Sequence, residues 1–175
     1  LLDRTGAVPG VANVALANSL PLGGASDYPP EYLMVSYEGF LAGDRTGVAG
    51  DRRSVSPGLF GTMNIPLTAG GDFHERDSYT NRKVAIVSSA LAGRLWPGRD
   101  PVGRQVAAVF AWNGFKDRID WFEVIGVVSD VSPILHEKGS RPAVYFALSQ
   151  EWRPSVNYVI ARGQGDSRTL FPAIK

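Results

Sequence analysis

The sequence predicts an α+β fold, and two observations carry that prediction. Short apolar and β-branched runs, separated by stretches rich in glycine and proline, indicate about eight or nine strands. Only about three or four short helices are indicated, and they do not follow every strand, as a doubly wound parallel sheet would require. The 175 residues, 44% of them apolar and 20% charged, suit one globular domain or two small ones.

The predicted strands share β-branched or aromatic residues that alternate with small or polar ones. They are residues 11–16, 32–37, 52–56, 83–87, 102–110, 121–128, 143–148 and 157–161. Residues 67–71 lead into a polar loop. Glycine, proline and polar residues gather in the remaining stretches, which predicts loops or irregular connections at 20–30, 39–50, 72–81 and 111–120.

The two helices in the first half of the chain are predicted from their ends. Residues 1–4 resemble the last turn of a helix, and Pro9 with Gly10 stops it, because proline and glycine do not continue helices. Ser56 is expected to cap a helical turn that runs to Met63. The proline after Ser56 would occupy the first helical position.

Two further helices are predicted later in the chain. Ser88 or Ser89 is expected to cap a short helix, which Pro97 and the glycine after it end. Asp166 or Ser167 is expected to cap a last helix, which the chain leaves incomplete. The chain starts at a leucine rather than a methionine, and we expect it to be a piece of a longer polypeptide.

Composition excludes several classes of protein. The net charge is +1, and no basic block stands out, which argues against nucleic acid as a partner; the pair Arg52 and Arg53 is expected on a solvated strand or loop. Without cysteine, the chain has no thiolate chemistry and no disulfides. Its apolar runs are far shorter than the roughly 20 residues of a membrane-spanning helix, and we find no signal peptide.

The strongest candidate for a metal site is the cluster Asp72, His74, Glu75 and Asp77. Four potential ligands within six residues are compatible with a divalent cation. No second histidine is nearby, and the regular acidic spacing of a calcium loop is missing. We therefore predict a solvated loop in which Asp72 or Asp77 caps a turn, with no metal and no cofactor.

Catalytic motifs are also weak. Ser88 and Ser89 follow a strand and open a helix, as a nucleophile elbow does, but the flanking glycines are missing, so helix capping is the prediction. His136 and Glu137 form an isolated pair that is typical of a surface loop. No glycine cluster is followed by the lysine of a phosphate-binding loop. We predict a chain that is not an enzyme.

Four tryptophans raise the alternative of a sugar-binding platform. Trp96 is expected to pack a helix on a sheet, and Trp112 is the best candidate for an exposed ring, with Trp121 and Trp152 completing the set. Exposed aromatic residues in loops favour protein contacts. We therefore predict that Trp112, Asn113 and Phe115 contact a partner.

A series of segments, taken in order, resembles the MacB-like periplasmic core domains of ABC-transporter permeases. They are Val55–Phe60, Ile65–Leu67, Ala69–Phe73, Val84–Gly98, Asp100–Val106, Phe122–Val131, Pro142–Phe146 and Tyr158–Arg162, and residues 1–21 fit the family's start. Gly71 stands where the family usually has an arginine, so any contact made by that arginine is in doubt here. Residues 107–120 are individual to this chain.

The resemblance implies a two-lobed domain inserted between the first two membrane helices of a permease. The larger lobe, of strand–helix–strand units in a mixed sheet, would comprise 1–81 and 133–175, and a smaller β-rich lobe, 82–132, would be inserted into it. The implied location is the periplasmic or extracytoplasmic face of the inner membrane. The implied partners are a second permease domain, a cytoplasmic ATPase reached through the membrane helices, and a periplasmic adaptor.

Our leading hypothesis is a domain that transmits conformational change and contacts partner subunits. The alternative is a periplasmic module that binds a small ligand or peptide between its lobes, which an apolar cleft with convergent polar groups would favour. A hydrolase or metalloenzyme is the third hypothesis, and a metal held by Asp72, His74 and Asp77 would favour it.

Overall fold

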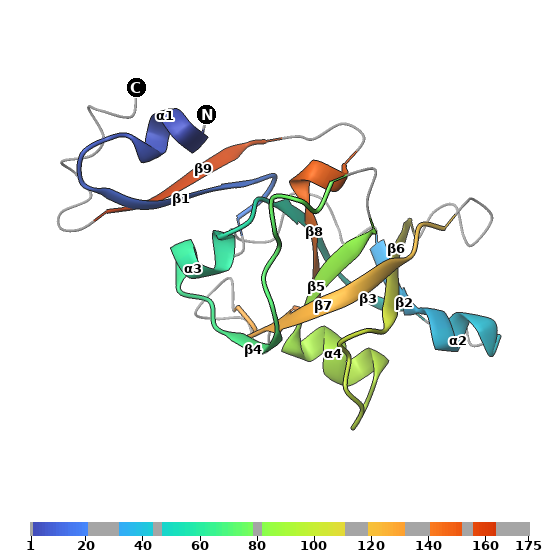
Figure 1. The fold of residues 1–175 in the computed structure, drawn as a ribbon. Coiled ribbons are helices and arrows are strands. Elements are labelled where there is room, and N and C mark those ends of the chain that lie inside the picture. Colours follow the sequence, from blue (N-terminus) through green and yellow to red (C-terminus); the bar gives the residue numbers. More distant parts are fainter. Residues whose placement is uncertain are drawn as a thin grey trace.

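The computed structural model describes residues 2–20, 32–43, 47–78, 82–110, 119–131, 141–151 and 156–163 (Figure 1). The architecture is α+β, as predicted. The helices are α1 (Leu2–Gly6), α2 (Tyr37–Leu41), α3 (Leu59–Met63) and α4 (Ser89–Leu95), with a 3-10 turn at Leu148–Gln150. The strands are β1 (Val11–Ala17), β2 (Tyr32–Ser36), β3 (Val48–Val55), β4 (Leu67–Gly70), β5 (Val84–Ser88), β6 (Gln105–Phe110), β7 (Phe122–Val128), β8 (Ala143–Ala147) and β9 (Tyr158–Gly163).

Six strands form a ring that closes on itself. The order is β2-β6-β7-β5-β8-β3, and β2 also pairs with β3, so the sheet has no free edge along this path. The pairs β5–β7 and β3–β8 are parallel, and the other pairs in the ring are antiparallel. β7 shares one edge between two partners, because β6 pairs with its first residues and β4 with its last. The sheet is mixed, as expected.

Strands β5 and β8 are buried on both faces and separate two hydrophobic cores. In β5, Val84 and Ile86 belong to one core, while Ala85 and Val87 belong to the other, as the two-residue period of a strand requires. β8 alternates in the same way. The continuous apolar run of β5 reflects this double burial.

The first core lies on the outer face of β5 and β8, under α3 and β1. Phe60 of α3 is fully buried, and its ring stands nearly perpendicular to the ring of Tyr145, with centroids 5.0 Å apart. Such edge-to-face pairs add about 0.5–1.5 kcal/mol to the area they bury. Ile65 and Phe73 complete the cover.

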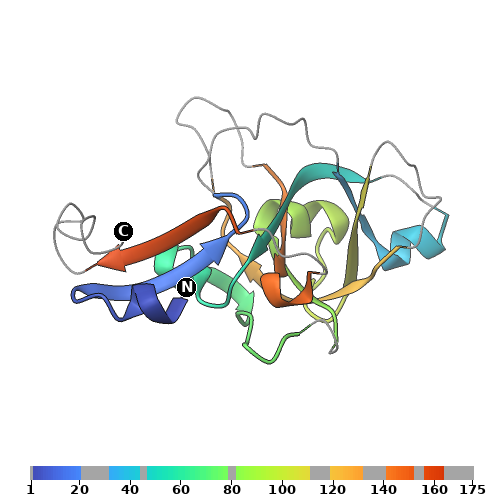
Figure 2. The ribbon, with the colours of Figure 1, turned by 90° about the horizontal axis from the view of Figure 1, so that it is seen from above.

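The second core fills the ring. Phe146 is 1% exposed and contacts the ring of Phe122, with centroids 4.3 Å apart. Helix α4 lies across one end of the ring and contacts strands on opposite sides of it, β3 and β7 (Figures 1 and 2). Leu91 and Trp96, both buried, fix α4 there.

Gly50 lets the ring close tightly where β3 faces β2. A Cβ atom at this position would lie 2.2 Å from the carbonyl oxygen of Pro142 and 2.4 Å from Cε of Met34. Both neighbours belong to packed parts of the structure, and Met34 is fully buried. The glycine therefore serves close packing rather than a turn.

Strands β1 and β9 form an antiparallel ribbon that projects from the ring, on the side opposite α2 (Figures 1 and 2). The ribbon joins the ring where Ala17 of β1 faces Val55 of β3, and backbone hydrogen bonds from the Asn18 amide to Ser54 and from the Ser56 amide to Leu16 flank this pair. Arg162 of β9 adds a tie to α3, since its Nε donates to the carbonyl oxygen of Thr62 at 2.7 Å and its Nη1 to Oδ1 of Asn64 at 2.5 Å.

Two predictions about the first half of the chain are wrong. Ser56 does not cap the helix: its hydroxyl accepts a hydrogen bond from the Leu16 amide at 2.9 Å, and α3 starts after Gly58, whose φ of 79° is left-handed. The predicted loop 39–50 contains helical residues, because Ser36 caps α2, and it also contains the start of β3, because β2 recruits Val48–Gly50 by pairing.

Three further predictions concern the second half of the chain, and their outcomes differ. β6 begins at Gln105 rather than at Val102, since Gly103, with a φ of 85°, turns the chain there. Ser88 caps α4, as predicted, by accepting from the Leu91 amide. The last helix predicted at Asp166 or Ser167 lies outside the described residues.

The division into a larger lobe (1–81 and 133–175) and an inserted lobe (82–132) stays a prediction. Within the described residues, the strands of the range 82–132 pair with strands outside it, β5 with β8 and β6 with β2. They also pair with one another.

Candidate functional site

An apolar surface lies at the α2 end of the molecule, far from the ribbon (Figure 1). Leu41 is 66% exposed, and Tyr37 and Val102 are each more than one-third exposed. Behind them, Trp121 packs edge-on against Tyr37, with ring centroids 5.0 Å apart, and against Phe40 at 5.5 Å. We call Tyr37, Leu41, Val102 and Trp121 the α2 surface. Exposed apolar side chains on an ordered support are typical of protein contacts.

Glu38 anchors α2 to the ring below this surface. Its carboxylate accepts hydrogen bonds from Nε1 of Trp96 at 3.3 Å and from Nη1 of Arg104 at 2.8 Å. Burial raises the pKa of Glu38, but the backbone and side-chain hydrogen bonds and the charge of Arg104 outweigh it, so the pKa lies below its ordinary value. The α2 surface is thereby held on the ring.

The residues predicted to contact a partner, Trp112, Asn113 and Phe115, lie outside the described residues. They belong to the connection between β6 and β7. Trp121 lies at the end of the same connection, just before β7, and was not among the residues predicted to contact a partner. Of the four tryptophans considered as a sugar-binding set, Trp96 is buried in the second core, as expected, and Trp112 and Trp152 lie outside the described residues.

The acidic loop after β4 forms turns, as predicted. Asp72 accepts from the amides of Phe73 at 2.7 Å and Gly58 at 3.2 Å, and Asp77 accepts from the amide of His74 at 2.7 Å. Burial raises the pKa of Asp72 in spite of those hydrogen bonds. Across the described ranges, no three histidine, aspartate or glutamate side chains come together to hold a metal ion.

The serines that resembled a nucleophile elbow are engaged in structure. The Ser88 hydroxyl is 2% exposed and accepts from two amides, those of Leu91 and Ala143. Ser89 donates to the carbonyl oxygen of Val128 at 3.1 Å. His136 and Glu137 lie outside the described residues. The described chain therefore brings no base to either serine.

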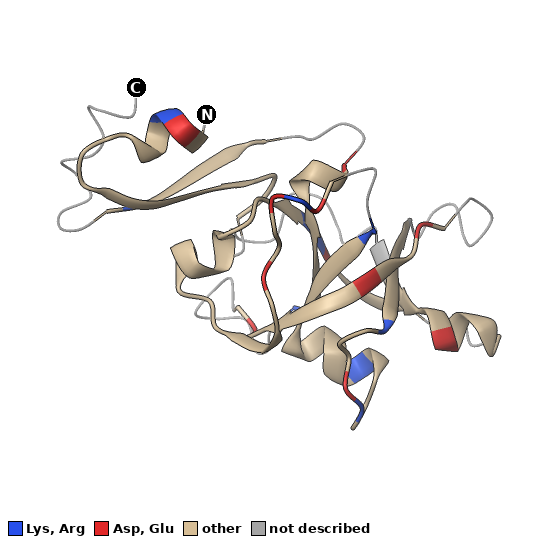
Figure 3. Ribbon diagram, in the orientation of Figure 1, with Lys and Arg blue, Asp and Glu red and all other residues tan. Residues whose placement is uncertain are grey.

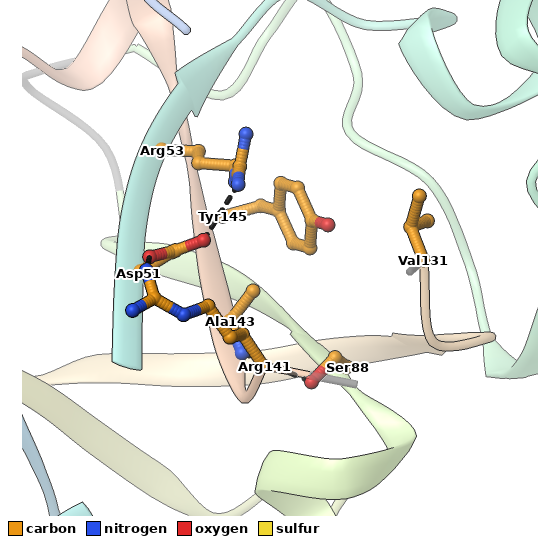
Figure 4. Close-up of a pocket in the computed structure, with 7 residues that line it drawn as sticks. All are labelled: Asp51, Arg53, Ser88, Val131, Arg141, Ala143 and Tyr145. Atoms are coloured by element: carbon orange, nitrogen blue, oxygen red, sulfur yellow. Dashed lines mark hydrogen bonds and ion pairs between the residues drawn. The ribbon is translucent and has the colours of Figure 1, made fainter. Parts of the chain in front are cut away.

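A buried polar cluster that the sequence analysis missed lies on the first-core side of β3 and β8 (Figure 4). Arg53 is 7% exposed, against the expectation of a solvated pair, because the strand period turns it inward and its neighbour Arg52 to the opposite face. Nη2 of Arg53 donates to Oδ2 of Asp51 at 2.6 Å, and its Nη1 donates to the carbonyl oxygen of Leu20.

Arg52 has a different environment on the opposite face of β3. It pairs with Glu151, and its guanidinium lies 5.0 Å from the centre of the Phe146 ring. Arg52 and Arg53 have different environments because neighbouring residues of a strand point to opposite faces, and the two faces of β3 meet different cores. A strand predicted from residue 52 already places the two side chains on opposite faces, but it does not reveal that the face carrying Arg53 is buried.

Charge is unevenly distributed between the ribbon and the ring. Figure 3 shows acidic and basic residues of both signs interspersed over the ring, whereas β1 carries none and β9 only Arg162. Searching the described residues for a helix long and apolar enough to cross a membrane finds none.

Comparison with known proteins gives the family and the fold. Residues 5–169 match the family described as MacB-like periplasmic core domain. The periplasmic region of MacB from Actinobacillus actinomycetemcomitans is 17% identical with a TM-score of 0.63, covering 99% of this chain and 71% of that one. The extracellular domain of the noncanonic ABC-type transporter YknZ from Gram-positive bacteria is 16% identical with a TM-score of 0.60, covering 98% and 75%.

A third solved structure, a domain of a putative permease protein from Porphyromonas gingivalis, is 15% identical with a TM-score of 0.55, covering 98% of this chain and 70% of that one. No curated protein matches the chain. At these identities, the solved structures establish the fold alone.

Proposed function

The chain belongs to the MacB-like periplasmic core domain family, and from this premise we propose that it transmits conformational change as a rigid body and contacts partner subunits. It is an extracytoplasmic domain of an ABC-transporter permease, on the periplasmic side of the membrane. A family of permease domains is not a class of enzymes, and we propose that this chain has no catalytic activity.

One observation carries the rigid-body proposal: the six-stranded ring is closed and filled. Its strands are paired on both sides along the closed path, and α4 covers one end. Protein interiors packed in this way resist compression and pass displacement on. The ring is therefore suited to move as one rigid unit when membrane helices or a partner move. Such a movement would be a hinge or shear motion.

We further propose that the partner contact lies at the α2 surface and includes Trp112, Asn113 and Phe115. Exposed Leu41 and Tyr37 support this, because they stand on a helix that is fixed to the ring by Glu38. The partner is a second permease domain or a periplasmic adaptor, and coupling to the cytoplasmic ATPase runs through the membrane helices of the parent chain.

The ligand-binding alternative receives less support. Two hollows among the described residues, of about 650 and 600 Å³, are open to solvent. The first lies along α1 and β1 and the second beside α2, and both have polar and apolar residues in their walls. A small-molecule site is typically an enclosed, mainly apolar cavity.

Spin labels test transmission directly in the membrane-embedded parent permease. The chain has no cysteine, so Arg94→Cys on the exposed side of α4 places one label in this domain of a cysteine-free parent. We expect the distance distribution between labels on two permease domains to shift as a narrow peak when ATP binds. Identical distributions with and without ATP would contradict the proposal.

The same labels test the contact. Leu41→Asp places a charge on the α2 surface and is expected to broaden the ATP-bound peak, because the apolar contact is lost. The matched control is Val156→Asp, an exposed aliphatic residue outside that surface, 41% exposed. Equal broadening by both variants, or by neither, would remove the α2 surface from the proposal.

A further inference from the structure

Beside the pair that Ala17 and Val55 make between β1 and β3, the side chain of Asn18 replaces part of the backbone ladder. In a regular antiparallel ladder, Asn18 and Ser54 would exchange two backbone hydrogen bonds. The backbone makes one of them, from the Asn18 amide to the Ser54 carbonyl oxygen at 3.0 Å. The Ser54 amide donates instead to Oδ1 of Asn18, at 2.9 Å. Ser54 is 2% exposed, so its amide depends on that side chain for an acceptor.

The same replacement occurs on the other side of the pair, where Ser56 lies opposite Leu16. The Ser56 amide donates to the Leu16 carbonyl oxygen, and the Leu16 amide donates to the Ser56 hydroxyl, both at 2.9 Å. Ser56 is 4% exposed, so this part of the joint is also shielded from water. Side-chain acceptors on both sides therefore complete the ladder between the ribbon and the ring.

Asn18 also brings β9 into the joint. Its carbonyl oxygen, which the Ser54 amide does not use, accepts a hydrogen bond from Nδ2 of Asn157 at 2.8 Å. The Asn157 amide, just before β9, donates to the carbonyl oxygen of Ala17 at 3.1 Å. Both strands of the ribbon are therefore held at the residue that ties β1 to β3. Farther along β9, Arg162 is tied to α3, so the ribbon is fixed at two separate points.

We propose, on the premise of the transmission function above, that Asn18 and Ser56 couple the ribbon rigidly to the ring and are positioning residues for transmission. α1, packed on β1, carries the first described residues and β9 the last, so movement passed along the backbone from either side reaches the ribbon before the ring (Figure 1). Rotation of the ribbon at the joint would absorb such movement. The two side-chain bonds oppose rotation, because opening either one leaves a backbone amide without its acceptor.

The distance between two spin labels in the 175-residue chain tests this coupling without membrane, partner or ATP. Ala12→Cys, exposed in β1, and Arg94→Cys, exposed in α4, place one label on the ribbon and one on the ring. We expect a narrow distance distribution in this background and one at least about twice as wide after Asn18→Ala. Asn18→Asp keeps the acceptor oxygen and should restore the narrow distribution. Ser56→Ala removes the other acceptor and should also broaden it.

The matched control is Ser36→Ala at the α2 end. It removes a bond of the same kind, in which the Gly39 amide donates to a serine hydroxyl, and should leave the ribbon-to-ring distribution unchanged. Three results would overturn the proposal: an unchanged width after Asn18→Ala, no recovery with Asn18→Asp, or equal broadening by Ser36→Ala. Urea unfolding of each variant ensures that all distances are measured on folded protein.

The parent permease separates this coupling from transmission itself. With the Arg94→Cys labels on two permease domains, Asn18→Ala should reduce the ATP-dependent shift of the distance peak at least about twofold, because the ring no longer follows the ribbon. A full shift in that variant would overturn the coupling role while transmission stands. A narrow ribbon-to-ring distribution without any ATP-dependent shift in the unsubstituted permease would contradict transmission and still support the rigid joint.

Discussion

The closed ring and the β1–β9 ribbon are built from similar strands but are stabilised in different ways. In the ring, β5 and β8 are buried at every position, and each strand on the closed path has two neighbours. Among the described strands, β9 pairs with β1 alone, and its residues Tyr158 and Val159 are about two-fifths exposed. The difference teaches that similar strands are buried on both faces or left partly exposed, depending on how many of their faces and edges are covered.

The largest expected effect comes from removing a ring side chain. Phe146→Ala leaves a cavity in the second core and should lower the free energy of unfolding by about 3–5 kcal/mol. The ribbon counterpart is Tyr158→Ala, which should cost less than about 1 kcal/mol, since that side chain is 43% exposed. Urea unfolding measures both. Comparable losses in the two variants would break the comparison between ring and ribbon.

A smaller, local effect is expected from the tie between the ribbon and α3. Arg162→Met keeps most of the side chain's length but removes the hydrogen bonds to Thr62 and Asn64, at a cost of about 1–2 kcal/mol. Amide hydrogen exchange should accelerate in β9 and β1 and stay unchanged in β5 and β8. Arg94→Met, on an exposed position of α4, is the control. Faster exchange throughout the ring would show that the two regions unfold as one.

The smallest expected effect on the free energy of unfolding concerns Glu38, which holds helix α2 on the ring. Because the folded pKa of Glu38 lies below its ordinary value, its stabilisation is present above about pH 4.5 and is lost as pH falls through the folded pKa. Glu38→Gln should abolish that part of the acid dependence and cost about 0.5 kcal/mol at neutral pH. Stability measured from pH 3 to 7 checks this, and identical slopes in both proteins would contradict it.

Prediction from the sequence succeeded where a local pattern decides the structure. The strand at β5 and the cap at Ser88 follow from an apolar run and a serine before a helix, and both are observed. Prediction failed where contacts with residues far away in the sequence decide the local structure. Gly50 looked like a loop residue because its role, making room for Met34 and Pro142, depends on parts of the chain far from it.

The polar cluster was missed for the same reason. Asp51, Arg53 and Tyr145 are separated along the chain, and only the register between β3 and β8, which pairs Arg53 with Tyr145, brings them together. The family and the location to which the resemblance pointed are confirmed, whereas the division into two lobes stays a prediction. The proposed partner contact at Trp112, Asn113 and Phe115 stays a prediction.

That β5 and β8 serve both cores has a mechanical consequence. Because one wall belongs to two interiors, no solvent-filled seam runs between them, and a load on either side reaches the other through side chains already in contact. The β1–β9 ribbon adjoins this double interior where Ala17 faces Val55, and backbone hydrogen bonds from the Asn18 amide to Ser54 and from the Ser56 amide to Leu16 flank that pair. A load applied to the ribbon therefore reaches the shared wall through the first core, in which Ala15 and Ala17 of β1 are buried.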